Sequence, residues 1–175
     1  MNVTESEQNE HNTGVCTRCG RASLAADLKV SDETMKEYLR CSLGGRVFSK
    51  TISVHGMFDL VFEALPADLE IALERYVQQH TPEISGVDLR TLVTLARIDK
   101  YDQDTGETTT VYEKDINTRR EFIKHPEKSF EELAKKLDSA MLGVVRRAGL
   151  SFLVLCGAII EELVDGDFYE GVGLL

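Results

Sequence analysis

Two short runs of alternating side chains, separated by only three residues, restrict the possible folds of this chain most. The runs are Val47–Val54 and Phe58–Leu65, and His55-Gly56-Met57 connects them. Such a short connection with a glycine is typical of a β-hairpin, because glycine adopts turn conformations without steric cost. The sequence therefore predicts an antiparallel ribbon with one buried face. The residues expected on that face are Phe58, Leu60, Phe62 and Ala64.

The stretch around this ribbon also carries a resemblance to a known family. It combines a Y-L-R triplet, a double glycine, an F-S-K-T run and a short glycine turn. The matching residues are Tyr38, Leu39, Arg40, Leu43, Gly44, Gly45, Phe48, Lys50, Thr51, Gly56 and Phe62. This pattern resembles small tail proteins of tailed bacteriophages, and more narrowly the baseplate-hub and tail-assembly proteins of contractile-tailed phages. The expected later part of the chain, a polar β-turn region followed by two long C-terminal helices, is similar as well.

The resemblance implies a structural component of a phage tail or baseplate, a hub-region subunit that acts through protein–protein contacts. It implies other tail and baseplate proteins as partners in a hetero-oligomeric assembly. The implied location is the virion, and the host cytoplasm during assembly. A tail-assembly chaperone that is absent from the mature virion would show the same sequence features and stays open. A small zinc-binding intracellular protein, or an enzyme of unknown substrate, is the further alternative.

The net charge and the hydropathy of the chain restrict which classes of partner it can have. The net charge of −10 and the pI near 4.9 argue against nucleic-acid binding, which needs a basic face to displace counterions. Residues 1–14 are polar and show no apolar core of a secretory leader. The apolar run Ala148–Ile160 is shorter than the roughly 20 residues that a membrane span needs. We therefore expect a buried helix there and no membrane span.

The cysteines suggest a candidate zinc site. Cys16 and Cys19 form a C-x-x-C-G knuckle, which is half of a tetrahedral zinc site, and Cys41 is a candidate third ligand. His11 or His55 would be the fourth. The alternatives are a structural thiol pair or disulfide and, least favoured, a redox site, because a thioredoxin-like motif belongs in a βαβ pattern. We expect no obligatory cofactor and leave zinc open.

The remaining elements before the C-terminal helices follow from spacing and breakers. Ser31 or Asp32 is expected to cap a helix that ends near Leu43, and Pro66 to open a helix that ends near His80. Leu89–Ile98 fits a helix, although its β-branched residues leave a strand open. Next we expect a β-arm with its turn at 102–107. A calcium loop starting at Asp102 is disfavoured because Gly106 stands one position early.

Helices are expected from Asp115 onward. Asn117 or Thr118 would cap the first, Pro126 would start the second, and Gly149 would mark a break or kink in the last. Together these patterns predict an α+β fold, predominantly helical, with a small antiparallel β-ribbon or sheet. The expected organisation is a polar N-terminal arm (1–14), a single α+β domain (15–165) and a C-terminal tail (166–175).

The sequence favours an interaction protein over an enzyme. It contains no G-x-S-x-G, Walker, G-x-G-x-x-G or H-E-x-x-H motif, and its four histidines fall in expected tail or turn positions. The polar arm, the β-arm and the apolar tail instead suggest several protruding contact elements. The predicted contact residues are Phe48, Lys50, Phe58, Phe168 and Tyr169.

Overall fold

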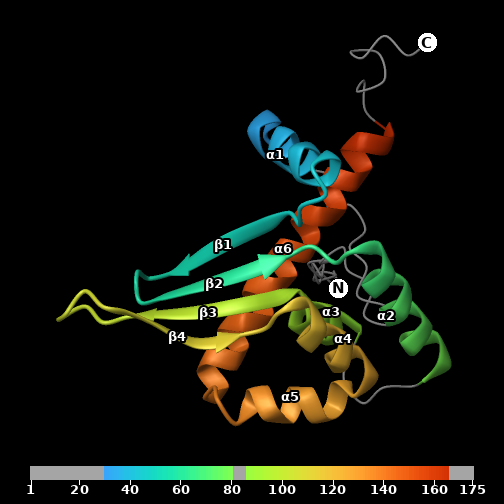
Figure 1. Ribbon diagram of the computed structural model, residues 1–175. Helices are drawn as coiled ribbons and strands as arrows, with labels where there is room; N and C mark the ends of the chain where they lie inside the picture. Colours follow the sequence, from blue (N-terminus) through green and yellow to red (C-terminus); the bar gives the residue numbers. More distant parts are fainter. Residues whose placement is uncertain (1–29, 81–85, 166–175) are drawn as a thin grey trace, which may run out of the picture.

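The computed structural model describes residues 30–80 and 86–165, and within these residues the predicted α+β class is confirmed (Figure 1). Groups of helices alternate along the chain with two pairs of strands, and the four strands form one antiparallel sheet. The elements are α1 Asp32–Leu43, β1 Ser49–Val54, β2 Phe58–Glu63, α2 Ala67–Gln79, α3 Gly86–Thr94, β3 Leu95–Tyr101, β4 Thr108–Glu113, α4 Ile116–Lys124, α5 Pro126–Ala134 and α6 Ser139–Asp165.

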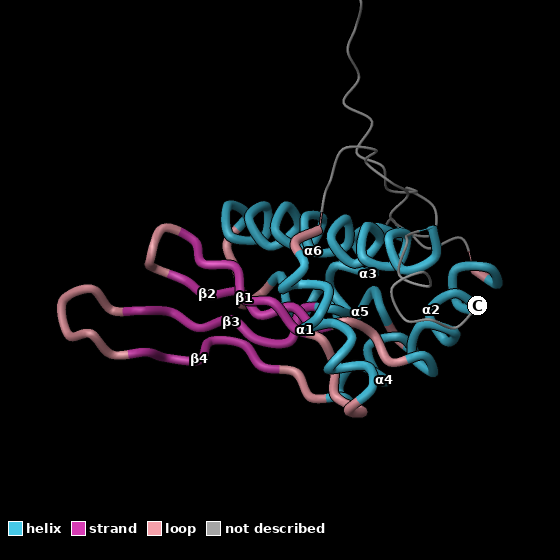
Figure 2. The backbone as a smooth tube through the Cα atoms, turned by 90° about the horizontal axis from the view of Figure 1, so that it is seen from above, coloured by secondary structure: helices cyan, strands magenta, loops and turns pink. Residues whose placement is uncertain are grey.

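The sheet has the strand order β1-β2-β3-β4, and each neighbouring pair is antiparallel. The predicted hairpin is confirmed: Val54 pairs with Phe58, and His55 and Gly56 both have positive φ at the turn. The predicted β-arm is confirmed as β3 and β4. In it, Asp102 Oδ1 accepts the backbone N–H groups of Asp104 (2.8 Å) and Thr105 (3.1 Å). Both hairpin tips project beyond the helices (Figure 2).

Helix α3 passes directly into strand β3 between Thr94 and Leu95. The stretch Leu89–Ile98, whose pattern left helix and strand open, is therefore helical up to Thr94 and a strand from Leu95 onward. Side chains replace the missing linker by satisfying the last helical carbonyls. The hydroxyl of Thr94 donates to the carbonyls of Arg90 (2.9 Å) and Thr91 (3.0 Å), and the ammonium of Lys114 donates to the carbonyl of Leu92.

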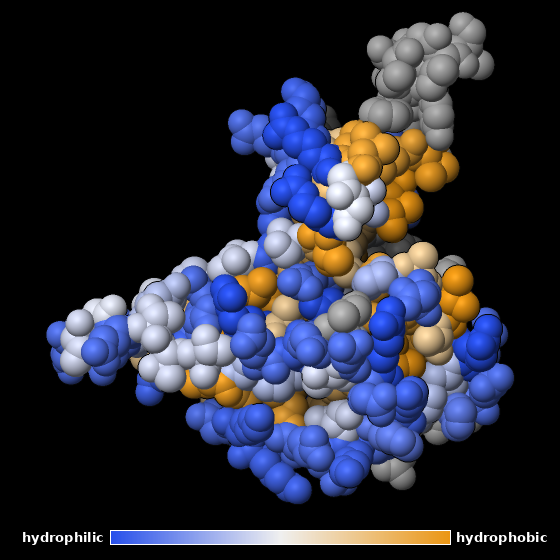
Figure 3. Space-filling view, viewed as in Figure 1, coloured by the Kyte–Doolittle hydropathy of each residue, from blue (hydrophilic) through white to orange (hydrophobic). Residues whose placement is uncertain are grey.

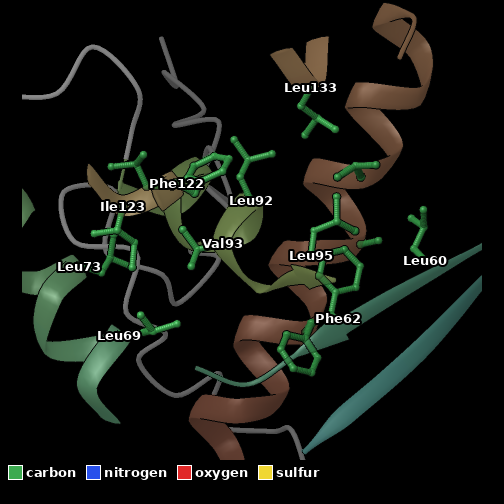
Figure 4. Packing of buried hydrophobic residues seen from close by; sticks show 14 of the residues in the cluster. Leu60, Phe62, Leu69, Leu73, Leu92, Val93, Leu95, Phe122, Ile123 and Leu133 are labelled. Carbon is green, nitrogen blue, oxygen red and sulfur yellow. The ribbon is translucent and has the colours of Figure 1, made fainter. Parts of the chain in front are cut away.

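The core lies between the sheet and the helices that cover one of its faces. Helix α6 is the longest element, with 27 residues, and it packs on α3 and β2 (Figures 1 and 2). Phe62 and Leu95 from the sheet and Leu92 from α3 gather along it (Figure 4). These three side chains are fully buried, so α6 forms the centre of the apolar core.

Glycine 149 is not a kink, and that prediction is wrong. Helix α6 continues through Gly149 without a break. A Cβ added there would lie 2.1 Å from Cγ2 of Thr91 on α3. Glycine is therefore needed at this position because α3 and α6 approach closely there, and not because the helix bends.

Two further expectations about the helices need correction. Asp115, not Asn117 or Thr118, caps α4, because its carboxylate accepts the N–H of Thr118 at 2.7 Å. The expected pair of long C-terminal helices is one long helix, α6, preceded by α4 and α5 with nine residues each. The caps at Ser31 and the helix start at Pro126 are confirmed.

A candidate interaction groove on helix α6

The second half of α6, from Leu153 to Asp165, exposes large apolar side chains. Residues Leu153, Gly157, Ile160 and Val164 fall on one side of it at helical spacing, and we call them the distal stripe. Leu153 is buried, but Ile160 is 51% and Val164 69% exposed. Figure 3 shows apolar atoms gathered over this end of α6, beside the hydrophilic outer face of α1. Exposed aliphatic side chains in such a row are typical of an interaction surface.

This end of α6 corrects the expectation of a fully buried helix. The helical stretch Ser139–Val164 is long and apolar enough to cross a membrane, by length and composition alone. Only 33% of its most apolar part is buried. The core helix of a soluble protein passes the same test. Because α6 packs on α3 and β2, we interpret it as a core helix whose second half extends past the sheet.

The distal stripe borders a groove of about 500 Å³. Its apolar lining comes from α6, including Phe152, from Ala64 and Leu65 just after β2, and from Tyr38 of α1. Such a volume accommodates a few aliphatic or aromatic side chains. The groove and the distal stripe share Leu153, Gly157 and Ile160, so the two adjoin.

Charged groups also line the groove. Arg90 of α3 is buried and pairs with Glu70 at 2.5 Å and Glu74 at 3.9 Å, both on α2. Glu161 adds a further carboxylate from α6. Burial, and secondarily Glu70, raises the pKa of the Cys156 thiol to about 12, so this thiol is neutral and unreactive near pH 7. The groove thus combines the ion pair of Arg90 and Glu70 and the carboxylate of Glu161 with apolar surface.

Helix α1 fixes the other side of the groove through a row of rings. Tyr38 meets Phe48 edge to face at 5.3 Å, and Phe48 stacks on Phe152 at 6.3 Å. Phe152 also stacks on Phe62 of β2 at 5.7 Å. These contacts connect α1, the segment before β1, α6 and the sheet, so the groove rests on a rigid aromatic support.

The predicted contact residues have different positions. Phe48 is only 2% exposed and belongs to the core, which corrects its assignment as a contact residue. Lys50 pairs with Glu37 of α1 at 2.7 Å, and Phe58 is half-buried against the core, so a contact role for these two stays a prediction. Phe168 and Tyr169 lie outside the described residues. The exposed residues Ile160 and Val164 were missed because an apolar helical stripe looks the same in sequence whether it is covered or not.

The structure describes only part of the predicted zinc site. Cys16, Cys19 and His11 lie outside the described residues, and Cys41 is a half-buried free thiol packed against the core. His55 stands beyond the far end of β1, whereas Cys41 precedes its near end, so about 20 Å of extended strand separates them. His55 and Cys41 therefore do not share a metal ion. Among the described residues, no group of three or more His, Cys, Asp or Glu side chains is arranged to hold a metal.

A buried basic pair is the second candidate site, and sequence reasoning missed it. Lys114 and Arg119 are 3% and 2% exposed. Burial, helped by the nearby Arg119 charge, lowers the pKa of Lys114 to about 7. A lysine of this kind is a candidate nucleophile. Its ammonium, however, donates to the carbonyl of Leu92 and lies 4.3 Å from the ring centre of Phe122.

These contacts make the basic pair a structural device at the junction of α3 and β3. Lys114 supplies the missing cap of α3, and Arg119 pairs with Glu63 at the end of β2. One pair thus ties α3, β2, β4 and α4 together. The only sequence signal is a lysine that directly follows a strand, which is too common to be diagnostic.

Comparison of the chain with protein-family models, curated proteins and solved structures gives no match.

Proposed function

We propose that this protein is a non-catalytic structural subunit that binds other proteins through the distal stripe of α6 and the adjoining groove. The observation that supports this most is the exposure of Ile160 and Val164 on a helix that also contributes Val145, Phe152 and Ile159 to the core. Two such side chains in a row next to an apolar groove lose solvent-exposed area when a partner covers them. The two projecting hairpins would add contacts of their own.

The specific assembly we propose is the tail or baseplate of a contractile-tailed bacteriophage, with this chain as a hub-region subunit. The resemblance of the Tyr38–Phe62 stretch to small phage tail proteins is the support for this choice. The geometry adds a reason for the resemblance: Tyr38, Phe48 and Phe62 belong to the aromatic row under the groove. The matching residues would therefore maintain the support of the contact surface.

The test compares wild-type and substituted chains in purified tail particles. Val164→Glu and Ile160→Glu place a charge on the distal stripe, and Ile71→Glu is the matched control, since Ile71 is 55% exposed on α2. We expect peptide mass spectrometry to find the wild-type chain and the control in the particles, and at least a tenfold loss of each stripe variant. Far-ultraviolet circular dichroism and melting of each purified chain check that all variants fold.

Three other outcomes would contradict the proposal. Equal incorporation of stripe variants and control would exclude the stripe as the contact surface. A chain present in assembly intermediates but absent from mature tails would indicate a tail-assembly chaperone. Binding of the purified chain to vesicles of phosphatidylethanolamine and phosphatidylglycerol, abolished by Val164→Glu, would replace the protein partner with a lipid surface.

A further inference from the structure

We infer that a second site, at the junction of β2, β4 and α4, binds an oxyanion such as phosphate or a carboxylate. A pocket of about 470 Å³ lies there, and its lining includes Glu63, Glu113, Lys114, Asp115 and Arg119. Among the described residues, this pocket and the groove beside α6 have no lining residue in common. The inference therefore does not rest on the proposed function.

The most deeply buried charges of this pocket are both positive. Lys114 and Arg119 are 3% and 2% exposed, whereas Glu113 and Asp115 are exposed and Glu63 is half-buried. Water and salt screen the exposed carboxylates, and that of Asp115 already caps α4. Two buried cations thus share one partly buried carboxylate, and this imbalance favours a further anion.

The buried cations also have more hydrogen-bond donors than the described residues accept. Nη2 of Arg119 donates to Glu63, but its Nε and Nη1 are buried and have no acceptor among the described residues. The ammonium of Lys114 has three donors, and it donates to the carbonyl of Leu92. Buried donors without acceptors are costly, and an oxyanion offers several acceptor oxygens to one guanidinium. The donors therefore select an oxyanion over a cation or an apolar ligand.

Glu63 stands where the oxyanion would bind. Its side chain is 33% exposed, so it can turn into solvent, whereas the side chain of Arg119 is held at 2% exposure. Glu63 belongs to the end of β2, and from there it bonds one guanidinium nitrogen. A free oxyanion is not tethered to the sheet, so it can approach the guanidinium edge-on and accept from two nitrogens. Glu63 and the ligand thus compete for Arg119.

Thermal unfolding at pH 7 tests this site, with inorganic phosphate and acetate as separate probes. Each probe is compared with sodium chloride at the same ionic strength. We expect phosphate to raise the melting temperature of the wild-type chain by about 2 °C, and that of Glu63→Gln by about 4 °C, because the competing carboxylate is gone. The matched control is Glu107→Gln, which removes an exposed charge from the β3–β4 turn and should respond as the wild type does.

A double variant shows whether the response comes from this pocket. Arg119→Met alone would leave Glu63 without its partner, so it is combined with Glu63→Gln, which replaces both partners of the ion pair. We expect this chain to fold, as circular dichroism can verify, and to lose the response to phosphate. The comparison of Glu63→Gln with Glu107→Gln does not depend on the double variant.

The two probes distinguish two sources of the same chemistry. A response to acetate with the same dependence on Glu63 and Arg119 would assign the site to a carboxylate, such as an acidic side chain of a partner. A response to phosphate alone would assign it to a phosphate group. No response to either probe would overturn the inference.

Two further results would also overturn it. Equal shifts in the wild type, Glu63→Gln and Glu107→Gln would show only the general stabilisation that excluded salts give to folded proteins. In hydrogen exchange, bound phosphate should slow residues 113–119 about threefold more than residues 153–164, and uniform slowing would contradict binding at this pocket. None of these results bears on the loss of Val164→Glu from tail particles, so the proposed function is tested separately.

Discussion

The two halves of α6 have similar apolar composition but different surroundings. The first half, Ser139–Phe152, packs on α3 and on the sheet, and Gly149 allows the contact with Thr91. The second half, Leu153–Asp165, extends past the sheet and leaves Ile160 and Val164 exposed. Because Ala158 and Ile159 of the second half are buried as well, we expect stability to depend mainly on the contacts with α3 and the sheet, and partner binding on Ile160 and Val164. Substitution of a residue that supports the packed half should therefore have a larger effect than substitution of a matched residue that does not.

The largest effect is expected at Phe152, where the two halves meet. Phe152→Ala removes the ring that stacks on Phe48 and Phe62 and leaves a cavity, so we expect a loss of about 3–5 kcal/mol in the free energy of unfolding. Val164→Ala, at a side chain that is 69% exposed, should cost less than about 0.5 kcal/mol. Urea unfolding measures both. Similar losses would show that the second half is as tightly packed as the first.

The next effect distinguishes two glycines on the same helix. Gly149→Ala places a methyl group 2.1 Å from Cγ2 of Thr91, so α3 and α6 must separate, and we expect a loss of about 2–3 kcal/mol. Gly143→Ala meets nothing within 4 Å and should stabilise the helix by about 0.5–1 kcal/mol. Opposite shifts in melting temperature would confirm the close crossing. A stable Gly149→Ala variant would disprove it.

Those glycines also show what the sequence could and could not predict. Gly56 was predicted correctly because a hairpin turn is a local structure, defined by the runs that flank it. Gly149 was predicted wrongly because the requirement for glycine comes from Thr91, more than fifty residues away in the chain. Phe48 was misassigned for the same reason: its neighbour Phe152 is distant in sequence. The hairpin turn and the cap at Ser31 could be predicted from the sequence, but contacts between distant elements could not.

Even less of the candidate groove could be predicted from the sequence. The apolar pattern of α6 predicted that the helix needs covering on most sides, but periodicity does not say which side chains lack a partner. The sequence also did not predict the boundary between α3 and β3, because the side chain that caps α3 is that of Lys114, on the far side of a hairpin. The exposed stripe and the buried lysine are thus both products of tertiary structure.

Lys114 leads to a prediction for the support of the packed half, because it caps the helix on which that half rests. Burial, with help from Arg119, lowers its pKa from 10.5 to about 7. Between these pH values the unfolded chain binds the proton that the folded chain has lost, so stability rises with pH. From pH 7 to pH 9 this contributes about 2 kcal/mol to the free energy of unfolding.

The comparison that isolates this contribution uses two lysine variants. Lys114→Met removes the titrating group, so the rise in stability between pH 7 and pH 9 should become smaller by about 2 kcal/mol than in the wild type. Lys128 is exposed on α5, and Lys128→Met should leave the wild-type slope unchanged. Urea unfolding across this pH range gives both slopes. Equal slopes in all three chains would show that Lys114 is charged in the folded state.

The smallest effect concerns the outer edge of the packed half. Arg146 binds Asp88 of α3 through two parallel bonds, from Nε to Oδ1 at 2.7 Å and from Nη2 to Oδ2 at 2.9 Å. Lysine keeps the charge but cannot make both bonds, so Arg146→Lys should cost about 0.5–1 kcal/mol, an amount reduced by added salt. Arg147→Lys, next to it on α6, should be neutral. Because Arg146 orients α6 on α3, its loss should also increase hydrogen exchange in residues 139–148 more than in the distal half. An increase confined to the distal half would mean that the two halves are mechanically coupled and that the division between stability and binding does not hold.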